Sequence, residues 1–530
     1  MQQVQLQINE QGLLRNQRYA FSNRTTLVSE LMQNARRAGA TRVEIDYDAD
    51  ARLLTVRDDG AGIDDFQKLL TFHESGWNDA TCRQERPFGI GFSKCLYAAT
   101  RCSVSSGGKR IDFATEHALE KLPIDVVDAD DAPGTEVVLH GVDLPDKLEE
   151  HVARLSRGFA IPVFFNSAGM ARPYALANLD CIAAEIGHVA LAGCRDGKSM
   201  RDTIIFLQGF CVMEPSYCNA DRCNVVHLDA TQFVARLPDR DRLIDENEQR
   251  EHIQACLSAL WREALLDAKA RLSPEDFVEI FYDAARSWRQ LDVFNDVPVL
   301  PRALCDRIVG YPIQERYGDR DYLQSVDAAI TRADVEQGAV VLADLDDVAQ
   351  DNAVHWMFAR ARGFIVFHSA GLHPQHWVQA HVRLLEHESI DVAILGEQCR
   401  TILEGRWIWP GVVLCDAVSL TVGGERAEIT DDGLFDREWL LIPKGEHSGE
   451  PVRQASDFVD GNDQFLDADL DADRDALCDL IHRLRAVDPQ SMLASLLRDV
   501  KLEKYPLLKG KTFRLTVGSA SGEHVVELLG

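Results

Sequence analysis

Glu30 and Asn34 have the residue types and the spacing that metal-assisted phosphate chemistry requires. Residues 27–38 place apolar side chains on one stripe of a helix, which predicts that these two polar residues project from a single helical face. A carboxylate there can orient and deprotonate a water molecule, and an amide oxygen can ligate Mg²⁺. By itself, the pair also fits two solvated side chains on an ordinary helix.

A glycine-rich turn follows a predicted hairpin. Residues 43–47 alternate apolar and acidic side chains, and residues 53–56 supply the second strand, which continues into Asp58, Gly60 and Gly62. Glycines at alternate positions let the backbone approach a ligand closely. An aspartate just before them can accept a hydrogen bond from an exocyclic amine such as that of adenine.

A second glycine pair, Gly89 and Gly91, opens a predicted helix over residues 92–99. Backbone amides at a glycine-rich helix start bind phosphate. The chain therefore combines a candidate hydrolytic pair, a candidate base-binding turn and a candidate phosphate-binding turn within its first hundred residues.

These three stretches resemble the N, G1 and G2 boxes of the GHKL, or Bergerat-fold, ATPases. That family includes the ATPase chain of DNA gyrase, the ninety-kilodalton heat-shock chaperone, sensor histidine kinases and MutL. Residues 34–45 are most similar to MutL, and residues 87–92 are most similar to the chaperone. A fourth piece, residues 134–139, resembles the chaperone's late Gly-Thr strand. Four pieces in the family's order and spacing are far more specific than one glycine motif.

The resemblance implies a site for ATP and Mg²⁺. Glu30 would be the general base, Asn34 the Mg²⁺ ligand and Asp58 the residue that recognises adenine. It also implies glycines and a threonine that complete the site: Gly60 and Gly62 near the base, Gly89 and Gly91 around the phosphates, and Thr135 in support of Asp58.

Two departures from the family pattern bear on turnover. Many members have aspartate where this chain has Arg37, which lies seven positions after Glu30 on nearly the same helical face. We expect Arg37 to pair with Glu30; the alternatives are a contact with a phosphate and a solvated helix residue. Arg86 replaces the first glycine of the usual third box. The segment 71–87 lies where the family has its ATP lid, although it also fits an ordinary surface loop.

The resemblance also implies a contribution from a second domain. In the chaperone and in MutL, that domain sends a basic residue to the γ-phosphate of ATP. Arg236, Arg240 and Arg242 are the candidates here, and Arg242 is included among the expected cofactor-binding residues. An arginine next to an aspartate also fits a surface ion pair.

The chain has 530 residues and a net charge of −29, from 56 basic and 85 acidic residues. An acidic chain repels the phosphate backbone, which disfavours nucleic-acid binding but leaves room for a local basic groove. No apolar run approaches the length of a membrane span, and the N-terminus lacks the features of a signal peptide. We therefore expect a cytoplasmic protein that does not contact a membrane.

Two kinds of side-chain cluster are candidates for metal sites. Among thirteen cysteines, Cys211, Cys218 and Cys223 lie near His227, but their spacing does not match a paired zinc site and favours reduced core thiols. The acidic stretch 457–475 lacks the glycine and the terminal glutamate of an EF-hand loop, which favours a solvated linker over a calcium site.

A second acidic group follows a predicted strand and consists of Asp344, Asp346 and Asp347. Ligands often bind at that position in α/β folds. The order of these carboxylates does not match the pattern of the topoisomerase catalytic domain, which favours a helix cap followed by a solvated turn.

The pattern of elements predicts an α+β protein of four parts. We expect a Bergerat-fold α/β sandwich followed by a smaller, S5-like α/β domain, an α/β module and a β-rich and helical region that contains the acidic linker. Their expected bounds are 1–170, 171–275, 276–400 and 401–530. In the second part we expect strands over residues 203–207 and 224–228 and a long helix over about residues 246–269. In the third part we expect a parallel layer that includes a helix over residues 377–385 and a strand over residues 390–395. The chain should close with a helix over residues 476–502 and a hairpin over residues 512–529.

The leading hypothesis is an ATP hydrolase, expected to be slow, in which ATP closes a lid and drives a conformational change that acts on a protein client or partner subunit. ATP-dependent homodimerisation is expected as well, although residues 1–20 are predicted to form an edge strand of the local sheet. The alternatives are a nucleotide-binding scaffold with little hydrolysis and a nucleic-acid-processing subunit of the MutL or gyrase kind.

Overall fold

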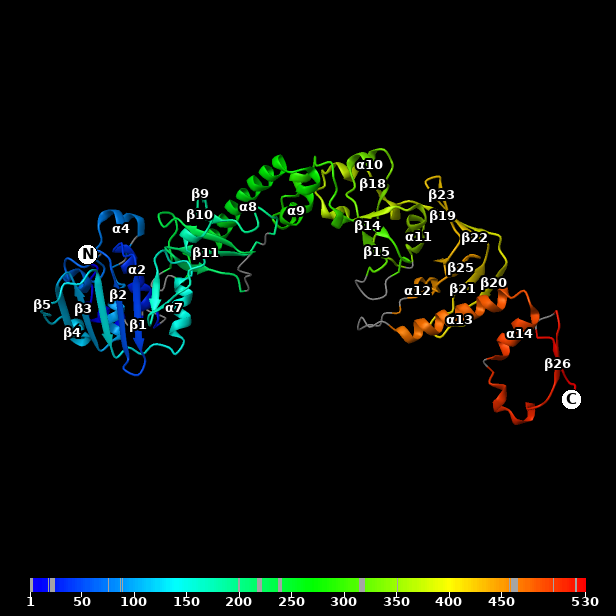
Figure 1. The fold of residues 1–530 in the computed structure, drawn as a ribbon, viewed down its shortest axis with the longest axis horizontal. Coiled ribbons are helices and arrows are strands. Elements are labelled where there is room, and N and C mark those ends of the chain that lie inside the picture. The colour runs from blue at the N-terminus through cyan, green and yellow to red at the C-terminus, as the bar shows by residue number, and fades with distance from the viewer. Residues whose placement is uncertain are drawn as a thin grey trace. The chain divides into compact units, whose positions relative to one another are not determined.

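The computed structural model describes residues 3–17, 19, 24–74, 76–85, 87, 89–198, 201–216, 222–236, 241–313, 320–349, 351–456, 458, 466–498, 500–519 and 522–530. It divides into two compact units, Met1–Val293 and Phe294–Gly530 (Figure 1). The α+β fold class is confirmed. The finer division into four parts stays a prediction.

An eight-stranded sheet forms the core of the first unit, in the order β5-β4-β3-β6-β2-β1-β7-β8. The predicted hairpin is present, with Val43 opposite Asp58, and β1 also pairs in parallel with β7. The strands are β1 (Val43–Asp48), β2 (Leu53–Asp58), β3 (Arg101–Ser106), β4 (Lys109–Ala114), β5 (Val126–Asp128), β6 (Thr135–His140), β7 (Val163–Phe165) and β8 (Ala168–Gly169).

Helices pack onto this sheet because their apolar stripes match its apolar side chains. Leu27 and Leu31 of α2, Leu96 of α5 and Val152 of α7 share one buried core with the strands. The remaining helices are short and surround the edge of the sheet. The helices of this part are α1 (Glu10–Gln17), α2 (Thr26–Arg37), α3 (Gln67–Leu70), α4 (Asp79–Glu85), α5 (Ser93–Ala98), α6 (Thr115–Leu119) and α7 (Leu148–Ser156).

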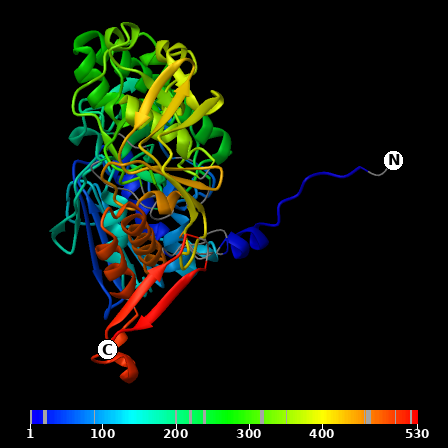
Figure 2. The same ribbon diagram turned by 90° about the vertical axis from the view of Figure 1, so that its right-hand side faces the viewer.

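The N-terminal segment differs from its prediction as an edge strand. Residues 3–9 pair with none of the described strands and run as an extended segment away from the sheet, with exposed Val4 and Leu6 (Figure 2). The chain then forms α1, whose Leu14 carbonyl accepts a hydrogen bond from Tyr97. Alternating side chains are not sufficient for a strand, because a strand also needs a neighbouring ladder for its backbone groups.

A second sheet, in the order β12-β11-β13-β10-β9, completes the first unit. The strands predicted at residues 203–207 and 224–228 are confirmed and pair in parallel. The long predicted helix is also confirmed as α8, which buries Trp261 on one stripe. The elements are η1 (Leu176–Asn178), β9 (Ile182–Ala184), β10 (Gly187–Ala190), β11 (Thr203–Leu207), β12 (Phe210–Met213), β13 (Asn224–Leu228), α8 (Glu246–Arg271), α9 (Pro274–Ser287) and η3 (Leu291–Phe294).

The second unit begins with a mixed sheet, β15-β14-β17-β16-β18, rather than a fully parallel layer. β16 pairs in parallel with β17 and β18, whereas β14 is antiparallel to β17. Residues 377–385, predicted as helix, form a short 3-10 turn and a strand. The elements are η4 (Arg302–Leu304), β14 (Cys305–Ile308), β15 (Leu323–Ser325), α10 (Arg332–Glu336), β16 (Leu342–Asp344), α11 (Ala353–Arg362), β17 (Ile365–Phe367), η5 (Ser369–Gly371), η6 (Trp377–Ala380), β18 (Val382–Leu384) and η7 (Leu385–His387).

Two further sheets confirm the predicted β-rich region. Residues 390–395, predicted as part of the parallel layer, instead pair antiparallel with β22. The sheets have the orders β19-β22-β23 and β20-β21-β25-β24. Their strands are β19 (Ile390–Leu395), β20 (Cys399–Ile402), β21 (Gly411–Leu414), β22 (Ala417–Val422), β23 (Glu425–Ile429), β24 (Leu434–Asp436) and β25 (Trp439–Ile442).

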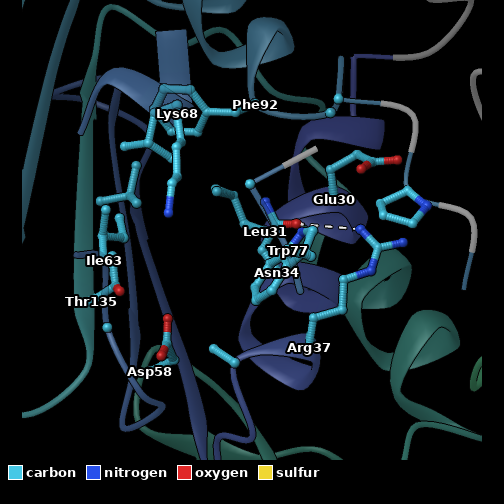
Figure 3. A pocket seen from close by; sticks show the side chains of 18 of the residues that line it. Glu30, Leu31, Asn34, Arg37, Asp58, Ile63, Lys68, Trp77, Phe92 and Thr135 are labelled. Carbon is cyan, nitrogen blue, oxygen red and sulfur yellow. Dashed lines mark hydrogen bonds between the residues drawn. The ribbon is translucent and has the colours of Figure 1, made fainter. Parts of the chain in front are cut away.

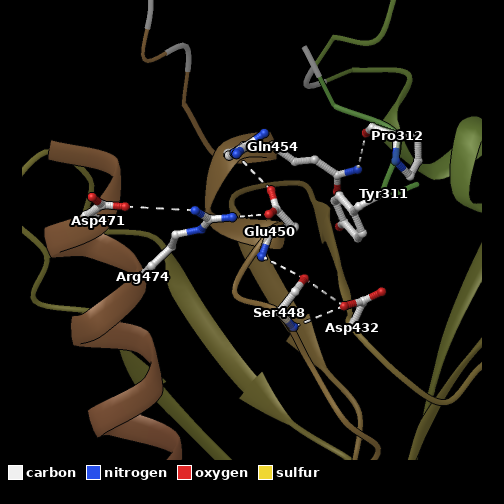
Figure 4. Close-up of polar contacts among 9 residues, drawn as sticks. Tyr311, Pro312, Asp432, Ser448, Glu450, Gln454, Asp471 and Arg474 are labelled. Atoms are coloured by element: carbon white, nitrogen blue, oxygen red, sulfur yellow. Dashed lines mark hydrogen bonds and ion pairs between the residues drawn. The ribbon is translucent and has the colours of Figure 1, made fainter. Parts of the chain in front are cut away.

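Buried polar side chains connect distant segments of the second unit (Figure 4). The Tyr311 hydroxyl donates to Gln454 Oε1 at 2.9 Å, and Gln454 Nε2 donates to the Pro312 carbonyl at 3.3 Å. Glu450, just before α12 (Pro451–Gln454), forms an ion pair with Arg474. Burial raises the pKa of Tyr311 well above its ordinary value. The hydroxyl therefore stays protonated and holds the two segments together.

The acidic stretch is not a linker throughout. Residues 467–475 lie in α13 (Asp467–Arg485), and Asp473 is 0% exposed. Its carboxylate accepts hydrogen bonds from the backbone N–H groups of Arg406 and Trp407, the latter at 3.0 Å. Asp473 of the acidic stretch therefore holds the loop at Arg406 and Trp407 against α13 through hydrogen bonds.

The C-terminal residues confirm the predicted hairpin, whose strands lie side by side (Figure 2). Before it, the predicted helix over residues 476–502 is interrupted after Arg485. The elements are α14 (Pro489–Arg498), η8 (Leu502–Lys504), η9 (Pro506–Leu508), β26 (Phe513–Val517) and β27 (His524–Leu528). In the described ranges, no helix has both the length and the apolar character needed to cross a bilayer.

We predict that Asp473→Ala lowers the free energy of unfolding by about 1–3 kcal/mol, because the substitution leaves buried backbone donors without their acceptor. Equilibrium urea unfolding measures the change. The matched control is Asp471→Ala on the same helix, whose side chain is 70% exposed. An equal effect of the two substitutions would contradict the assigned role of Asp473.

Candidate functional site

One cavity in the first unit brings together most of the residues selected from the sequence (Figure 3). Its space, counted out to the open mouth, is about 1290 Å³. Gly60 and Arg242 are not among the residues that line it. The sequence-selected residues that do line it are Glu30, Asn34, Arg37, Asp58, Gly62, Gly89, Gly91 and Thr135.

Helix α2 supplies one wall of the cavity. Its apolar stripe, which includes Leu27 and Met32, is fully buried in the core. The opposite stripe presents Glu30, Asn34 and Arg37 to the cavity, as the helical spacing predicted (Figure 3). Glu30 is only 7% exposed, which places a carboxylate inside a largely enclosed space.

Asp58 forms the opposite end of the cavity, where β2 ends. Its Oδ1 accepts a hydrogen bond from the Gly60 N–H at 2.9 Å, and its backbone lies opposite Thr135 of β6. Burial raises the pKa of Asp58 above its ordinary value, although the Gly60 hydrogen bond opposes the shift. Asp59 has a different role, because its carboxylate accepts the backbone N–H groups of Thr41 and Arg42 at 2.7 and 2.9 Å.

Gly60 affects the cavity indirectly. A Cβ atom there would lie 2.7 Å from the Ala38 Cβ and 2.9 Å from Asp58 Oδ1. Gly60 therefore packs behind Asp58, and its place near the adenine base stays a prediction.

Ser106, at the end of β3, was not selected from the sequence. Its hydroxyl accepts the Ile63 N–H at 2.8 Å and donates to the Gly134 carbonyl at 2.7 Å. It also lies 3.4 Å from the Thr135 hydroxyl. A single buried serine thus joins the glycine-rich turn to the Gly-Thr strand, and no local motif marks it.

The start of α5 approaches Glu30 closely. A Cβ atom at Gly91 would lie 2.1 Å from Glu30 Oε2, so only glycine fits beside the carboxylate in this position. Gly89 has φ +66°, and a Cβ there would lie 2.5 Å from the Glu74 carbonyl oxygen. Gly89 is therefore required by the close approach of the Glu74 backbone, whereas a side chain at Gly91 would displace the Glu30 carboxylate from its present position.

Arg37 has a partner that the sequence did not predict. Its Nε donates to Glu85 Oε2 at 2.8 Å, whereas we expected an ion pair with Glu30. The same oxygen accepts Arg36 Nη2 at 2.7 Å. Arg37 Nη1 also lies 3.5 Å from Asn34 Oδ1 (Figure 3). Glu85 can reach Arg37 because α4 folds back beside α2, which residue spacing along one helix cannot show.

The segment predicted as a lid contributes directly to the cavity. Gly76, Trp77 and Pro87 line it, and residues 79–85 form α4. Arg86, the departure from the third box, lies outside the described residues. The neighbouring Lys68 also lines the cavity and forms an ion pair with Asp64 at 3.2 Å.

Two of the three candidate arginines of the second domain lie in the described part of the chain, and neither lines the cavity. Arg236 and Arg242 are more than half exposed and lie 3.5 and 4.0 Å from Asp241, which matches the alternative of surface ion pairs. Arg240 lies outside the described residues. Instead, Gln208 in the turn between β11 and β12 contacts Gln33 of α2.

The candidate metal clusters have structural roles among the described residues. His227 Nε2 lies 2.7 Å from the Tyr174 carbonyl, its ring stacks on Phe206, and Cys223 is buried in the core of that sheet. Cys218 lies outside the described residues. Within the described ranges, no group of three or more His, Cys, Asp or Glu side chains is arranged to hold a metal ion.

The family comparison agrees with this geometry. Residues 22–127 match the family model of histidine kinase-, DNA gyrase B- and HSP90-like ATPases. This part of the chain is a GHKL-type ATPase domain. The match supports ATP binding by this part of the chain. No curated protein matches the chain. The resemblance to MutL and to the heat-shock chaperone in particular stays a prediction.

The cavity of the GHKL domain is strongly acidic. Five carboxylates and two cationic side chains line it. The cationic ones are Arg37 and Lys68. A polyphosphate placed among so many carboxylates requires additional positive charge. The lining therefore fits a nucleotide that enters together with a divalent cation.

We predict that Gly91→Ala weakens ATP binding about tenfold or more, because overpacking costs about 1–3 kcal/mol and the new methyl group forces the Glu30 carboxylate into the cavity. Titration calorimetry measures the affinity. Gly169→Ala is the control, because a Cβ there would lie 3.6 Å from the Phe164 ring, an ordinary contact. Unchanged affinity in Gly91→Ala would contradict this packing.

Proposed function

We propose that the protein is a Mg²⁺-dependent ATP hydrolase in which Glu30 acts as general base. The position of Glu30 gives this proposal its main support. Glu30 is a buried carboxylate on the cavity face of α2, one helical turn from Asn34. It also lies beside the glycine pair that precedes α5. A general base must lie within reach of the attacking water and be held there by its surroundings. Both the close fit against Gly91 and the helix itself supply that restraint.

Adenine would bind at the other end of the cavity. Asp58 accepts the exocyclic amine there, and Thr135 supports it from the neighbouring strand. Gly62 and Ile63 form the adjacent wall, which Ser106 holds in place through the Ile63 N–H. An apolar wall beside a single carboxylate suits a flat aromatic base that carries an amine.

Phosphates would bind between α2 and the start of α5. The backbone around Gly89 and Gly91 borders that space, and Asn34 Oδ1 would hold the Mg²⁺ ion. The bound ion would neutralise phosphate charge and polarise the terminal phosphoryl group. Asn34 fits this role because it lines the cavity and its amide oxygen is a ligand type that Mg²⁺ accepts.

In the proposed reaction, Glu30 orients a water molecule in line with the terminal phosphoryl group and accepts a proton as the water attacks. The bond between the terminal phosphorus and the bridging oxygen breaks, and ADP leaves with that oxygen. Arg37 lies one turn beyond Asn34 and is a cation that can stabilise charge on the terminal phosphate. Its ion pair with Glu85 limits that contribution, which is consistent with slow turnover.

We further propose that ATP binding moves the lid segment and the second sheet, and that this motion acts on a protein client or partner subunit. An ATP-dependent homodimer is part of this proposal. The direct contact between Gln208 and α2 supports communication between the two sheets. The net charge of −29 favours a protein partner over nucleic acid.

A nucleotide-binding scaffold with little hydrolysis is the second candidate. The observation that favours it is the position of Arg37 Nη1, 3.5 Å from the oxygen that would ligate Mg²⁺. A cation at that distance opposes metal binding. A steady-state ATPase assay with and without Mg²⁺ separates the two candidates.

We predict that Asp58→Ala weakens ATP binding by about 1–3 kcal/mol, since it removes the acceptor for the adenine amine. Calorimetry with ATP and Mg²⁺ measures the loss. Asp59→Ala is the matched control: its carboxylate holds the backbone of Thr41 and Arg42 and does not line the cavity. Its ATP affinity should stay near that of the unsubstituted protein. If Asp58→Ala also kept full affinity, the assignment of the adenine end would be wrong.

We predict that Glu30→Ala binds ATP but turns it over more slowly by about 10²–10⁴-fold, because a general base acts in the transition state. Parallel measurements of ATP affinity and phosphate release distinguish this from a loss of binding. Wild-type turnover by Glu30→Ala would show that another group is the base.

A further inference from the structure

Glu85 is the point at which three elements of the first unit meet. It ends α4, and its carboxylate accepts hydrogen bonds from Arg36 and Arg37 of α2. Its backbone carbonyl accepts Gln208 Nε2 at 3.3 Å, and Gln208 Oε1 accepts a hydrogen bond from Gln33. The lid segment, the helix of the ATP site and the β11–β12 turn are thus connected through one residue.

Two cations share one anion at this junction. Two guanidinium groups share a single carboxylate oxygen, and the side chains of Arg37 and Glu85 are 3% and 14% exposed. Removing a shared anion from a buried cation is unfavourable unless another anion replaces it. Glu85 can therefore leave Arg37 most easily when a second anion arrives.

Arg37 can receive such an anion because it also lines the ATP cavity. Its guanidinium lies on the same face of α2 as Glu30 and Asn34, at the end where phosphates would bind (Figure 3). The terminal phosphate of a nucleoside triphosphate reaches further toward this end than that of a diphosphate. The two nucleotides would therefore differ in their ability to compete with Glu85.

The β11–β12 turn is attached to the first sheet through the Gln208 side chain. Gln208 and Gly209 form the two-residue loop of this hairpin, and their φ values of +56° and +89° are those that a type I′ turn requires. The strand ladder therefore sets the backbone of the turn. The hydrogen bonds with Gln33 and Glu85 connect its side chain to α2 and to the end of α4.

We propose that Glu85 is a positioning residue that competes with the terminal phosphate of ATP for Arg37, and that its displacement releases the β11–β12 turn. The second sheet would thereby respond to a triphosphate and not to a diphosphate. This inference rests on the proposed function, because it places the phosphates at the Arg37 end of the cavity.

Hydrogen–deuterium exchange of residues 203–213 in the full chain tests the inference. The protein is measured alone, with ADP and Mg²⁺, and with a non-hydrolysable ATP analogue and Mg²⁺. We expect the analogue to raise exchange in this segment about tenfold, the size of a typical coupling between two sites. ADP should leave the exchange unchanged.

The decisive variant is Glu85→Gln, which removes the charge but keeps the size of the side chain. We expect raised exchange of residues 203–213 before any nucleotide is added, no further response to the analogue, and tighter binding of the analogue because Arg37 is released. Arg37→Ala should leave the turn unresponsive to the analogue. A merely structural Glu85 would change stability without changing the difference between triphosphate and diphosphate.

Glu214→Gln is the matched control. Glu214 directly follows β12 and forms an ion pair with Arg157, so the same substitution is made beside the same sheet but away from α2. Its response to the analogue should equal that of the unsubstituted protein. If Glu85→Gln does not fold, Gln208→Ala replaces it, with raised exchange, no further response to the analogue and, because the coupling is reciprocal, tighter binding of the analogue.

Calorimetry on the same samples separates the two proposals. If the unsubstituted protein binds the analogue but residues 203–213 do not respond, or if Glu85→Gln responds like the unsubstituted protein, the role of Glu85 is overturned and the proposed function stands. Absence of nucleotide binding by the unsubstituted protein would overturn both.

Discussion

The packing of α2 against the eight-stranded sheet is the interaction on which the ATP site depends. Leu27, Val28 and Met32 are completely buried, and each such side chain contributes about 1.5–3 kcal/mol relative to an exposed one. This burial fixes the rotation of the helix about its own axis. Because Glu30 and Asn34 lie on a different face of α2 from these apolar side chains, the same burial directs them into the cavity.

The two ends of the cavity are formed by different kinds of secondary structure. The end at Asp58, where we propose that adenine binds, is formed by strands: the ladder between β2 and β6 places Asp58 opposite Thr135, and Ser106 joins three backbone segments. The end at Arg37, where we propose that phosphates bind, is formed by a helix, a glycine pair and a charged junction around Glu85. The first end is rigid because its backbone hydrogen bonds belong to one sheet. The second depends on ion pairs that another anion can replace.

Buried polar side chains of the second unit join segments that are far apart in the sequence. Tyr311 and Gln454 join distant segments, and Asp473 holds the loop at Arg406. Such buried and satisfied polar groups specify one arrangement of the chain.

Local signals in the sequence determined the strands and helices of the first unit and the main site residues. Helical spacing placed Glu30, Asn34 and Arg37 on one face, strand alternation located β1 and β2, and glycine pairs marked the two turns, because each of these properties depends on neighbours within a few residues. Tertiary structure alone decided which carboxylate pairs with Arg37, that Ser106 supports the adenine end, and that Gln208 rather than Arg242 approaches α2. Each of those contacts joins residues tens of positions apart, and no periodicity records which distant surfaces meet. The same reason explains why alternation at residues 3–9 gave no strand and why Asp473 in an acidic stretch is buried: the decisive partner lies elsewhere in the chain.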